Sequence, residues 1–309
     1  MGDERMRGRI PAERVVLTSF VVDVLDIFLG VLVALISGSM VMVSQAMEGV
    51  ADLVASGFLV VGVKRSRRRS DSKHPYGYGR ELYFWTFLAA IITFSVTSVV
   101  TFYLGLKRFL NPGEIENIGL AYAVLILTTA TNGYSLSLSM RRLVGRRNIS
   151  SWWRIFTNSA LIETKTTLIL DTMGTLASVL GLGALILYRS TGNMKFDGIG
   201  AMLIGLTLAA LALLIVEGAR DLLVGQSASP EVNERIKEAA LSFGHVRKVI
   251  DLKTLHQGSD RLLVNMEVNL DDKLTTNEIE RLIDRIEKEI KKEVPSAKSI
   301  QIELETEDV

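Results

Sequence analysis

Long apolar runs constrain the fold of this chain more than any other feature. Between Val15 and about Val224 the 309-residue sequence carries a series of runs of roughly 20 or more mostly apolar residues, each long enough as a helix to cross a hydrocarbon core about 30 Å thick. The first run is too long for a signal-peptide core, so we expect it to stay as the first span. The sequence therefore predicts six membrane spans, at about 15–36, 40–63, 82–106, 117–139, 160–188 and 198–219.

Basic residues between these runs predict the orientation of the spans. The N-terminal tail and the connections after the second and fourth runs are rich in Lys and Arg, whereas the connections on the other side hold few. The positive-inside rule then places both termini in the cytoplasm. A large soluble helical protein would not need this alternation. We expect a multi-pass integral membrane protein, in the plasma membrane if the source is a prokaryote.

The composition narrows the chemistry. The chain has no cysteine, three histidines and a formal net charge of +1, which excludes disulfides, thiolate metal sites and a Cys nucleophile and gives no bulk attraction to nucleic acid. No span carries a Ser-His arrangement, an aspartate pair within a substrate-cutting motif, or a His-Glu-x-x-His pattern. We expect neither enzymatic activity nor a bound cofactor.

The region after Gln226 is patterned like a small soluble domain. Ser229 and Pro230 open a helix over 229–243, and a capping box from Thr275 to Glu278 opens a second helix over 275–294. Alternating apolar residues predict strands around 247–255, 261–270 and 298–305. The fold class is thus a six-helix transmembrane bundle, 1–224, followed by a cytoplasmic ferredoxin-like α/β domain, 228–309, with its helices on one face of the sheet.

Acidic residues inside two spans are the main functional signal. Glu48 and Asp52 lie four residues apart in the second run, and Glu163, Thr167 and Asp171 repeat that spacing in the fifth. Each set shares one helical face. Charge near the bilayer centre costs about 2.5–3.5 kcal/mol per residue, so such groups face a wet cavity or bind a cation. They could instead hydrogen-bond neighbouring helices or lie near the membrane surface.

Small residues at four-residue spacing predict close helix packing in the last two spans. Gly174 and Ser178, Ala177 and Gly181, and Ala201 and Gly205 form such pairs.

Together with the stretch "DSKHPYGYGRELYFW" (71–85), these features resemble the cation diffusion facilitator (cation efflux) family. The resemblance implies a homodimeric transporter that exchanges Zn²⁺, Mn²⁺, Fe²⁺, Co²⁺ or a related ion for protons across the lipid bilayer. It also implies a four-residue transport site, here Glu48, Asp52, Thr167 and Asp171. Zinc carriers of the family usually have a histidine in this set, often where Thr167 stands.

The ligand types bear on the choice of ion and on coupling. Carboxylate and hydroxyl oxygens suit hard ions, which favours Mn²⁺ or Fe²⁺ over Zn²⁺. Zn²⁺ stays a possible cargo because the resemblance implies that the family also transports Zn²⁺. Two carboxylates sharing a low-dielectric site hold at least one proton when no metal is bound, and metal entry displaces it. The sequence therefore predicts proton-coupled efflux of a divalent metal. The alternative is a scaffold or metal-responsive subunit of the same fold that does not transport.

Weaker candidates lie outside this set. Asp71 and His74 match the family's secondary loop metal position, although Tyr78 stands at the third ligand, and they could equally order the turn before "PYGYG". The other weak candidates are Glu163, at the cytoplasmic end of its span, and three polar-facing strand residues that could instead form a solvated sheet face: Glu267, Glu303 and Glu305.

A last group of residues has open roles. His256 sits in a predicted hairpin turn and is read as a ligand or a turn residue, while His245 is read as structural. Asp23 and Asp26 share a face of the first span and either line a cation path or contact interior waters and neighbouring helices. Trp152 and Trp153 are read as interfacial anchors.

Overall fold

A computed structural model describes residues 12–144 and 162–306. Its helices and strands follow the predicted order: α1 Ala12–Ser37, α2 Met40–Ser66, α3 Glu81–Ile92, η1 Thr93–Ser98, α4 Val99–Leu110, α5 Ile118–Val144, α7 Ile162–Thr191, α8 Lys195–Val224, α9 Pro230–Leu241, β1 Val246–Gly258, β2 Arg261–Leu270, α10 Thr276–Glu293 and β3 Ala297–Leu304. The described residues form two compact units. One holds the long helices, and the other holds Arg65–Glu81 together with the residues from Asp221 onward.

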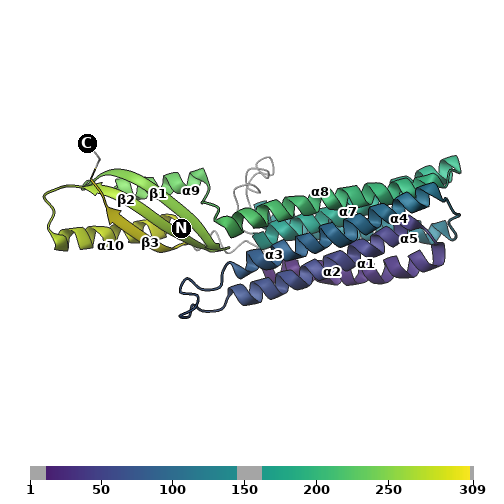
Figure 1. The fold of residues 1–309 in the computed structure, drawn as a ribbon, viewed down its shortest axis with the longest axis horizontal. Helices are drawn as coiled ribbons and strands as arrows, with labels where there is room; N and C mark the ends of the chain where they lie inside the picture. Colours follow the sequence, from purple (N-terminus) through teal and green to yellow (C-terminus); the bar gives the residue numbers. More distant parts are fainter. Residues whose placement is uncertain (1–11, 145–161, 307–309) are drawn as a thin grey trace. The chain divides into compact units, whose positions relative to one another are not determined.

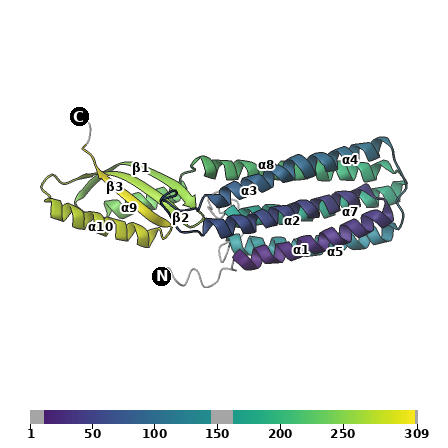
Figure 2. The ribbon, with the colours of Figure 1, turned by 60° about the horizontal axis from the view of Figure 1, so that its bottom comes forward.

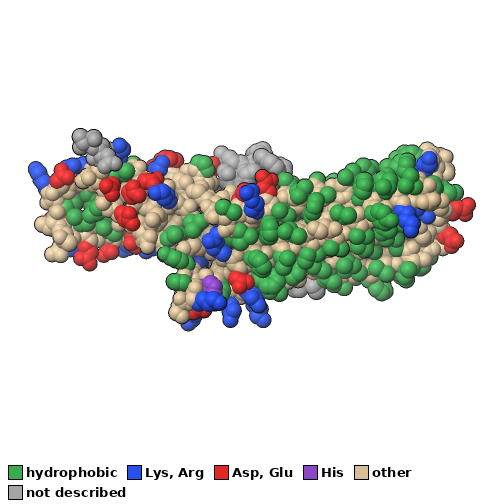
Figure 3. All heavy atoms as spheres, viewed as in Figure 1, with side chains coloured by type: hydrophobic (Ala, Val, Ile, Leu, Met, Phe, Trp, Pro, Cys, Tyr) green, Lys and Arg blue, Asp and Glu red, His purple; other side chains and the backbone are tan. Residues whose placement is uncertain are grey.

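The first unit is a bundle of long helical segments that lie side by side (Figures 1 and 2). Within the described residues, four segments are long and apolar enough to cross a membrane: Met40–Ser66, Glu81–Leu110, Lys165–Thr191 and Lys195–Val224. Apolar side chains cover most of the visible face of this unit (Figure 3), and Phe28, Leu35 and Ile126 are among its exposed large residues. Such a surface fits lipid rather than water, so the chain is a multi-pass membrane protein.

The third predicted span is confirmed with one local difference. It runs from Glu81 to Leu110 but contains a π-helical segment, η1, between α3 and α4. The hydroxyl of Ser98 donates to the carbonyl of Thr93, five residues earlier. Nothing in the apolar pattern indicated this widened turn, because the hydrophobic spacing continues through it.

Small residues bring helices into close contact, as predicted. A Cβ atom on Gly205 of α8 would lie 2.8 Å from the backbone nitrogen of Phe102, and one on Gly105 of α4 would lie 2.6 Å from that of Met202. A Cβ on Gly181 of α7 would lie 2.8 Å from Cγ1 of Val41 in α2. At Gly205 and Gly105 a methyl group would force the backbones apart, and at Gly181 it would displace the Val41 side chain.

A buried carboxylate ties three helices together at one end of the bundle. Asp197, in the first turn of α8, is fully buried and accepts hydrogen bonds from the Ser39 hydroxyl (2.7 Å) and from the backbone N–H groups of Met40 (2.8 Å) and Val41 (3.0 Å). Arg108 of α4 donates at 3.0 Å to Oδ2, the oxygen that also accepts the Met40 N–H. Asp197 thereby caps the start of α2 from another helix and satisfies N–H groups that α2 cannot bond itself.

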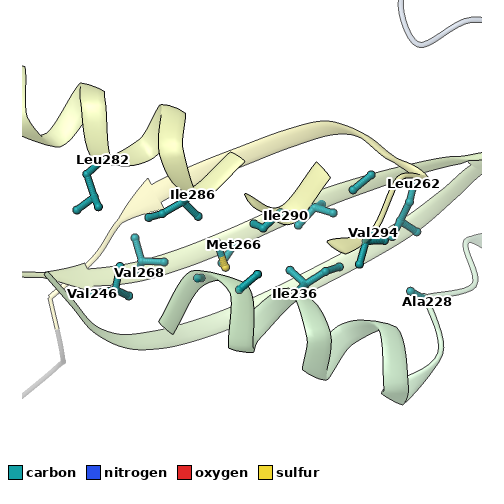
Figure 4. Close-up of a cluster of buried hydrophobic side chains, with 14 of the residues drawn as sticks. Ala228, Ile236, Val246, Leu262, Met266, Val268, Leu282, Ile286, Ile290 and Val294 are labelled. Atoms are coloured by element: carbon teal, nitrogen blue, oxygen red, sulfur yellow. The ribbon is translucent and has the colours of Figure 1, made fainter. Parts of the chain in front are cut away.

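The second unit contains the predicted α/β domain. Its sheet has the order β1-β2-β3, with β1 antiparallel and β3 parallel to β2. Alternate β2 residues, among them Val264, Met266 and Val268, pack with Ile236 of α9 and Ile286 of α10, so both helices lie on one face (Figure 4). The ferredoxin-like prediction is confirmed in its element order and its one-sided helical layer.

Both predicted helix starts are found in this domain. Thr275 precedes α10 and forms the full capping box with Glu278. Ser229 occupies the cap position of α9 with Pro230 as the first helical residue, but its side chain makes no cap hydrogen bond.

The connection between α2 and α3 packs on the hairpin of this domain. A Cβ on Gly79 would lie 2.1 Å from the backbone oxygen of Gln257, near the end of β1, and the Arg80 side chain donates to the Leu223 carbonyl. Gly77 has a positive φ of 81°, a conformation that glycine adopts without strain. The two glycines of "PYGYG" are therefore required by a turn and by a close backbone approach.

Candidate metal centre

The first half of the predicted centre lies on α2. The side chains of Glu48 and Asp52 are 2% and 4% exposed, and they share the buried face of the helix with Ser44, Gln45 and Ser56. This face contrasts with Val50, Val54 and Val60, which are exposed. The polar side of α2 therefore points into the bundle and its apolar side points out, the reverse of a soluble amphipathic helix.

The second half lies on α7. Thr167 and Asp171 are 2% and 3% exposed and lie one turn apart. Both oxygens of Asp171 are held by the neighbouring α5: the Ser135 hydroxyl donates to Oδ1 at 2.8 Å and the Ser139 hydroxyl donates to Oδ2 at 2.6 Å. The carboxylate thus has a fixed orientation at the α5–α7 interface.

A contact between Val41 and Gly181 sets the relative depth of the two halves. Val41 is at the start of α2 and Gly181 lies in the second half of α7, and the two helices run in opposite directions (Figure 2). At 1.5 Å per residue, Asp171 lies about 15 Å along α7 from that contact, and Glu48 and Asp52 lie about 10 and 16 Å along α2. Asp171 is therefore at the depth of the α2 pair, and Thr167 is one turn farther along.

The arrangement in this structure is not a closed metal cage. Across the described ranges, no three His, Asp or Glu side chains stand together in a group ready to hold a metal ion. The four predicted residues are buried on two helices, the three carboxylates at similar depth and Thr167 one turn farther along, with Asp171 turned toward α5. Whether all four meet on one ion stays a prediction.

Sequence reasoning missed the contribution of α5. Thr128, Asn132, Ser135 and Ser139 are all nearly inaccessible to solvent, and their spacing of four, three and four residues forms one stripe of a helix. A Cβ on Gly174 would lie 2.7 Å from the Asn132 amide oxygen, so the stripe faces α7. Polar residues at this spacing in an apolar run were the available signal.

The loop candidates Asp71 and His74 form a local turn. One Asp71 oxygen accepts the backbone N–H groups of Lys73 and His74, and the other accepts the Tyr78 hydroxyl at 2.6 Å. The bond from Tyr78, followed by that from the His74 N–H, holds the pKa of Asp71 below its ordinary value. The His74 and Tyr78 rings lie 4.2 Å apart. These contacts support the turn-ordering interpretation.

The strand candidates lie on the helix-free face of the sheet. Glu267 pairs with Glu303 of β3 and with Asp251 of β1, so three carboxylates cross the sheet in one row. Lys253 bonds Asp251 at 2.7 Å and lies 3.9 Å from Glu267. Glu305 follows β3 and is exposed. This row, neutralised in part by Lys253, has the character of a solvated sheet face.

The remaining histidines have structural surroundings. His245 bonds Asp271 at 3.2 Å, and this bond, with a second from Arg247, holds the pKa of Asp271 below its ordinary value. The predicted turn position of His256 is wrong. His256 lies within β1, opposite Leu262, because β1 continues to Gly258 and the turn falls at Ser259 and Asp260.

Five earlier predictions concern side chains outside the described part of the structure: Asp23, Asp26, Trp152, Trp153 and Glu163.

Comparison with known proteins adds independent information. Residues 16–224 match the model of the cation efflux transmembrane domain, and residues 228–307 match that of the cation efflux protein cytoplasmic domain. The chain is 24% identical to the mitochondrial proton-coupled zinc antiporter SLC30A9 of Homo sapiens, over 94% of this chain and 58% of that protein. It is also 24% identical to the magnetosome protein MamB of Paramagnetospirillum magneticum, over 94% of this chain and 93% of that protein.

A solved structure of the MamM CTD in a nickel form covers 26% of this chain at 22% identity and a TM-score of 0.24, too low a score to support an argument. The chain spans a little under three fifths of the length of the vertebrate zinc antiporters it matches.

The two family models together cover nearly the whole chain, from the first helix of the bundle to the last strand of the sheet. The helical bundle and the α/β domain occur in that order in the structure. This protein therefore belongs to the cation efflux, or cation diffusion facilitator, family.

Proposed function

We propose that the protein is a divalent metal efflux transporter that exchanges its cargo for protons. One observation carries the proposal: Glu48, Asp52, Thr167 and Asp171 are all nearly inaccessible to solvent and lie within about two helical turns of depth on α2 and α7. Three of the four are carboxylates, which are costly in a bilayer unless a cation or proton compensates them. The burial of the three carboxylates at similar depth on the two helices supports a shared cation.

The ligand chemistry and the relatives favour different ions. Carboxylate oxygens and the Thr167 hydroxyl suit Mn²⁺ or Fe²⁺, whereas the vertebrate relatives are zinc antiporters by name. Manganese or iron is the cargo that this chain's own residues support best, with zinc and cobalt as competitors in any assay.

Proton exchange follows from the spacing of the α2 pair. Two ionised carboxylates one helical turn apart repel each other strongly where water is scarce, so a proton replaces the metal when the metal leaves. If the site opens to one membrane face with metal and to the other with protons, a proton gradient drives metal export.

The proposed assembly has two parts and two copies. Residues 1–224 form the transmembrane domain, and residues 228–309 form a cytoplasmic domain through which the chain dimerises. The match to a family cytoplasmic domain and the excess of basic residues in alternate connections support both termini lying in the cytoplasm.

Flux measurements in vesicles test this proposal. In liposomes with an imposed pH gradient, the purified protein is expected to transport Mn²⁺. In detergent solution, addition of Mn²⁺ is expected to release protons from the protein. Asp52→Ala and Asp171→Ala should abolish both signals, while Asp251→Ala, on the exposed sheet face, should leave them intact. Metal binding without flux would instead identify a scaffold or sensor, and wild-type proton release from the first two variants would refute the site.

A further inference from the structure

The hydroxyl groups of Ser135 and Ser139 leave their own helix to reach α7. Buried Ser and Thr side chains in helices usually bond a carbonyl three or four residues earlier. On the same two helices, the Ser178 hydroxyl bonds the Gly174 carbonyl at 2.9 Å and the Thr129 hydroxyl bonds that of Leu125 at 2.6 Å. Ser135 and Ser139 depart from this pattern and each donates to a different oxygen of Asp171.

These two bonds define how Asp171 can act as a ligand. Each carboxylate oxygen accepts one serine hydroxyl, and two donors placed on different oxygens fix the plane of the group. Ser135 and Ser139 are 1% and 0% exposed, so bulk water does not compete for these bonds. The carboxylate is consequently oriented before an ion arrives.

Helix packing supports the same arrangement. The Asn132 side chain lies so close to Gly174 that a Cβ there would be 2.7 Å from its amide oxygen. Gly174 lies three residues after Asp171, and Asn132 lies three residues before Ser135. The α5 stripe therefore lies against α7 at the carboxylate and for about one further turn beyond it.

We propose that α5 forms a third wall of the transport site, in which Ser135 and Ser139 are positioning residues that orient Asp171 toward the metal ion. This inference rests on the transport function proposed above. Groups that orient a metal ligand matter for affinity, and their loss typically costs about 10- to 100-fold in metal binding.

Metal titration of the full-length protein in detergent tests this role. Isothermal titration with Mn²⁺ is expected to give a dissociation constant about 10- to 100-fold higher for the Ser135→Ala/Ser139→Ala double variant than for the wild type. Ser139→Thr keeps a hydroxyl donor, so its affinity for Mn²⁺ should be much closer to that of the wild type than the affinity of Ser139→Ala. Ser178→Ala is the matched control, because it removes an equally buried hydroxyl that bonds only its own helix.

Transport kinetics separate positioning from general packing. In vesicles the Ser135→Ala and Ser139→Ala variants should raise the KM for Mn²⁺ more than they lower the maximal rate. Size-exclusion chromatography and thermal unfolding identify any variant that fails to fold. If the double variant fails to fold, the two single variants are used to test the positioning role.

The possible outcomes are distinct. Wild-type affinity in the double serine variant, with binding lost in Asp171→Ala, would overturn the inference and leave the transport function standing. An equal loss in Ser178→Ala, or no recovery in Ser139→Thr, would also overturn it, since the effect would then be packing. Absence of Mn²⁺ and Zn²⁺ binding by the wild type would refute the proposed function itself, and the inference with it.

Discussion

The Oγ atom of Ser139 on α5 lies 2.6 Å from Oδ2 of Asp171 on α7. This hydrogen bond orients one predicted metal ligand from a helix that carries none of the others. The proposed site therefore involves three helices: α2 with two carboxylates, α7 with a carboxylate and a hydroxyl, and α5 with the donors that hold Asp171.

Thr167 should control the choice between ions. Thr167→His places an imidazole one turn from Asp171, and imidazole suits Zn²⁺ better than Mn²⁺. We expect the preference for Zn²⁺ over Mn²⁺ to rise about tenfold, or about 1.4 kcal/mol, in a competition assay in vesicles. Thr172→His is the control, because Thr172 is on another face and bonds the Leu168 carbonyl. An unchanged ion preference in Thr167→His would argue against a ligand role for Thr167.

Asp197 should stabilise the fold without binding cargo. Asp197→Ala leaves Arg108 without its 3.0 Å partner and removes the cap of α2. Breaking a buried ion pair typically costs about 3–5 kcal/mol, so the free energy of unfolding in denaturant titration should fall by that order. Lys107→Ala, at the exposed neighbour of Arg108, should change it little. Equal stability of Asp197→Ala and wild type would disprove the proposed cap.

Gly105 should be intolerant of even one methyl group. A Cβ there would lie 2.6 Å from the Met202 nitrogen and 2.9 Å from the Gly198 oxygen, and backbone atoms cannot move aside cheaply. We expect Gly105→Ala to lower the free energy of unfolding by about 1–3 kcal/mol. In Gly183→Ala, where nothing lies within 4 Å, alanine should be neutral or stabilise by up to about 1 kcal/mol. The same sign for both variants would contradict the packing described.

The turn before "PYGYG" should depend on pH through Asp71. The pKa of Asp71 in the folded protein is held below the ordinary value of 3.8, first by the Tyr78 hydroxyl. The hydrogen bonds of the ionised Asp71 carboxylate therefore stabilise the turn fully above pH 3.8, and this stabilisation is lost as the pH falls through the folded-state pKa. Tyr78→Phe should move the pKa of Asp71 back toward 3.8, as measured by carboxyl carbon NMR. Tyr76→Phe, at an exposed ring, is the control and should leave the titration unchanged.

Strong sequence periodicity predicted most of the fold. Runs of about 20 apolar residues predicted the bundle, and alternation through Val264, Met266 and Val268 predicted β2 and its buried face. Placement of His256 failed because the strand pattern weakens near Gly258, whereas the backbone pairing continues. The local sequence suggests where a strand ends, but hydrogen bonding to a partner strand can extend the strand beyond that point.

The candidate site was predicted only in part. Carboxylates in apolar helices are conspicuous, so Glu48, Asp52 and Asp171 could be predicted as candidates from the sequence, and the structure shows that all three are buried. Ser135 and Ser139 were not, because serine is common in membrane helices and usually bonds its own backbone. Asp197 was missed for another reason: its role as a cap for α2 joins residues more than 150 positions apart, a relationship that no local pattern encodes.

The most direct test of the central claim is the position of the bound ion in an anomalous X-ray map of protein loaded with Zn²⁺ or Mn²⁺. The account predicts one peak inside the bundle that is bonded by an oxygen of Glu48 or Asp52 from α2 and by an oxygen of Asp171 from α7, at about 2.0–2.2 Å for Zn²⁺. A peak bonded by only one of these helices, or no peak within the bundle, would contradict it.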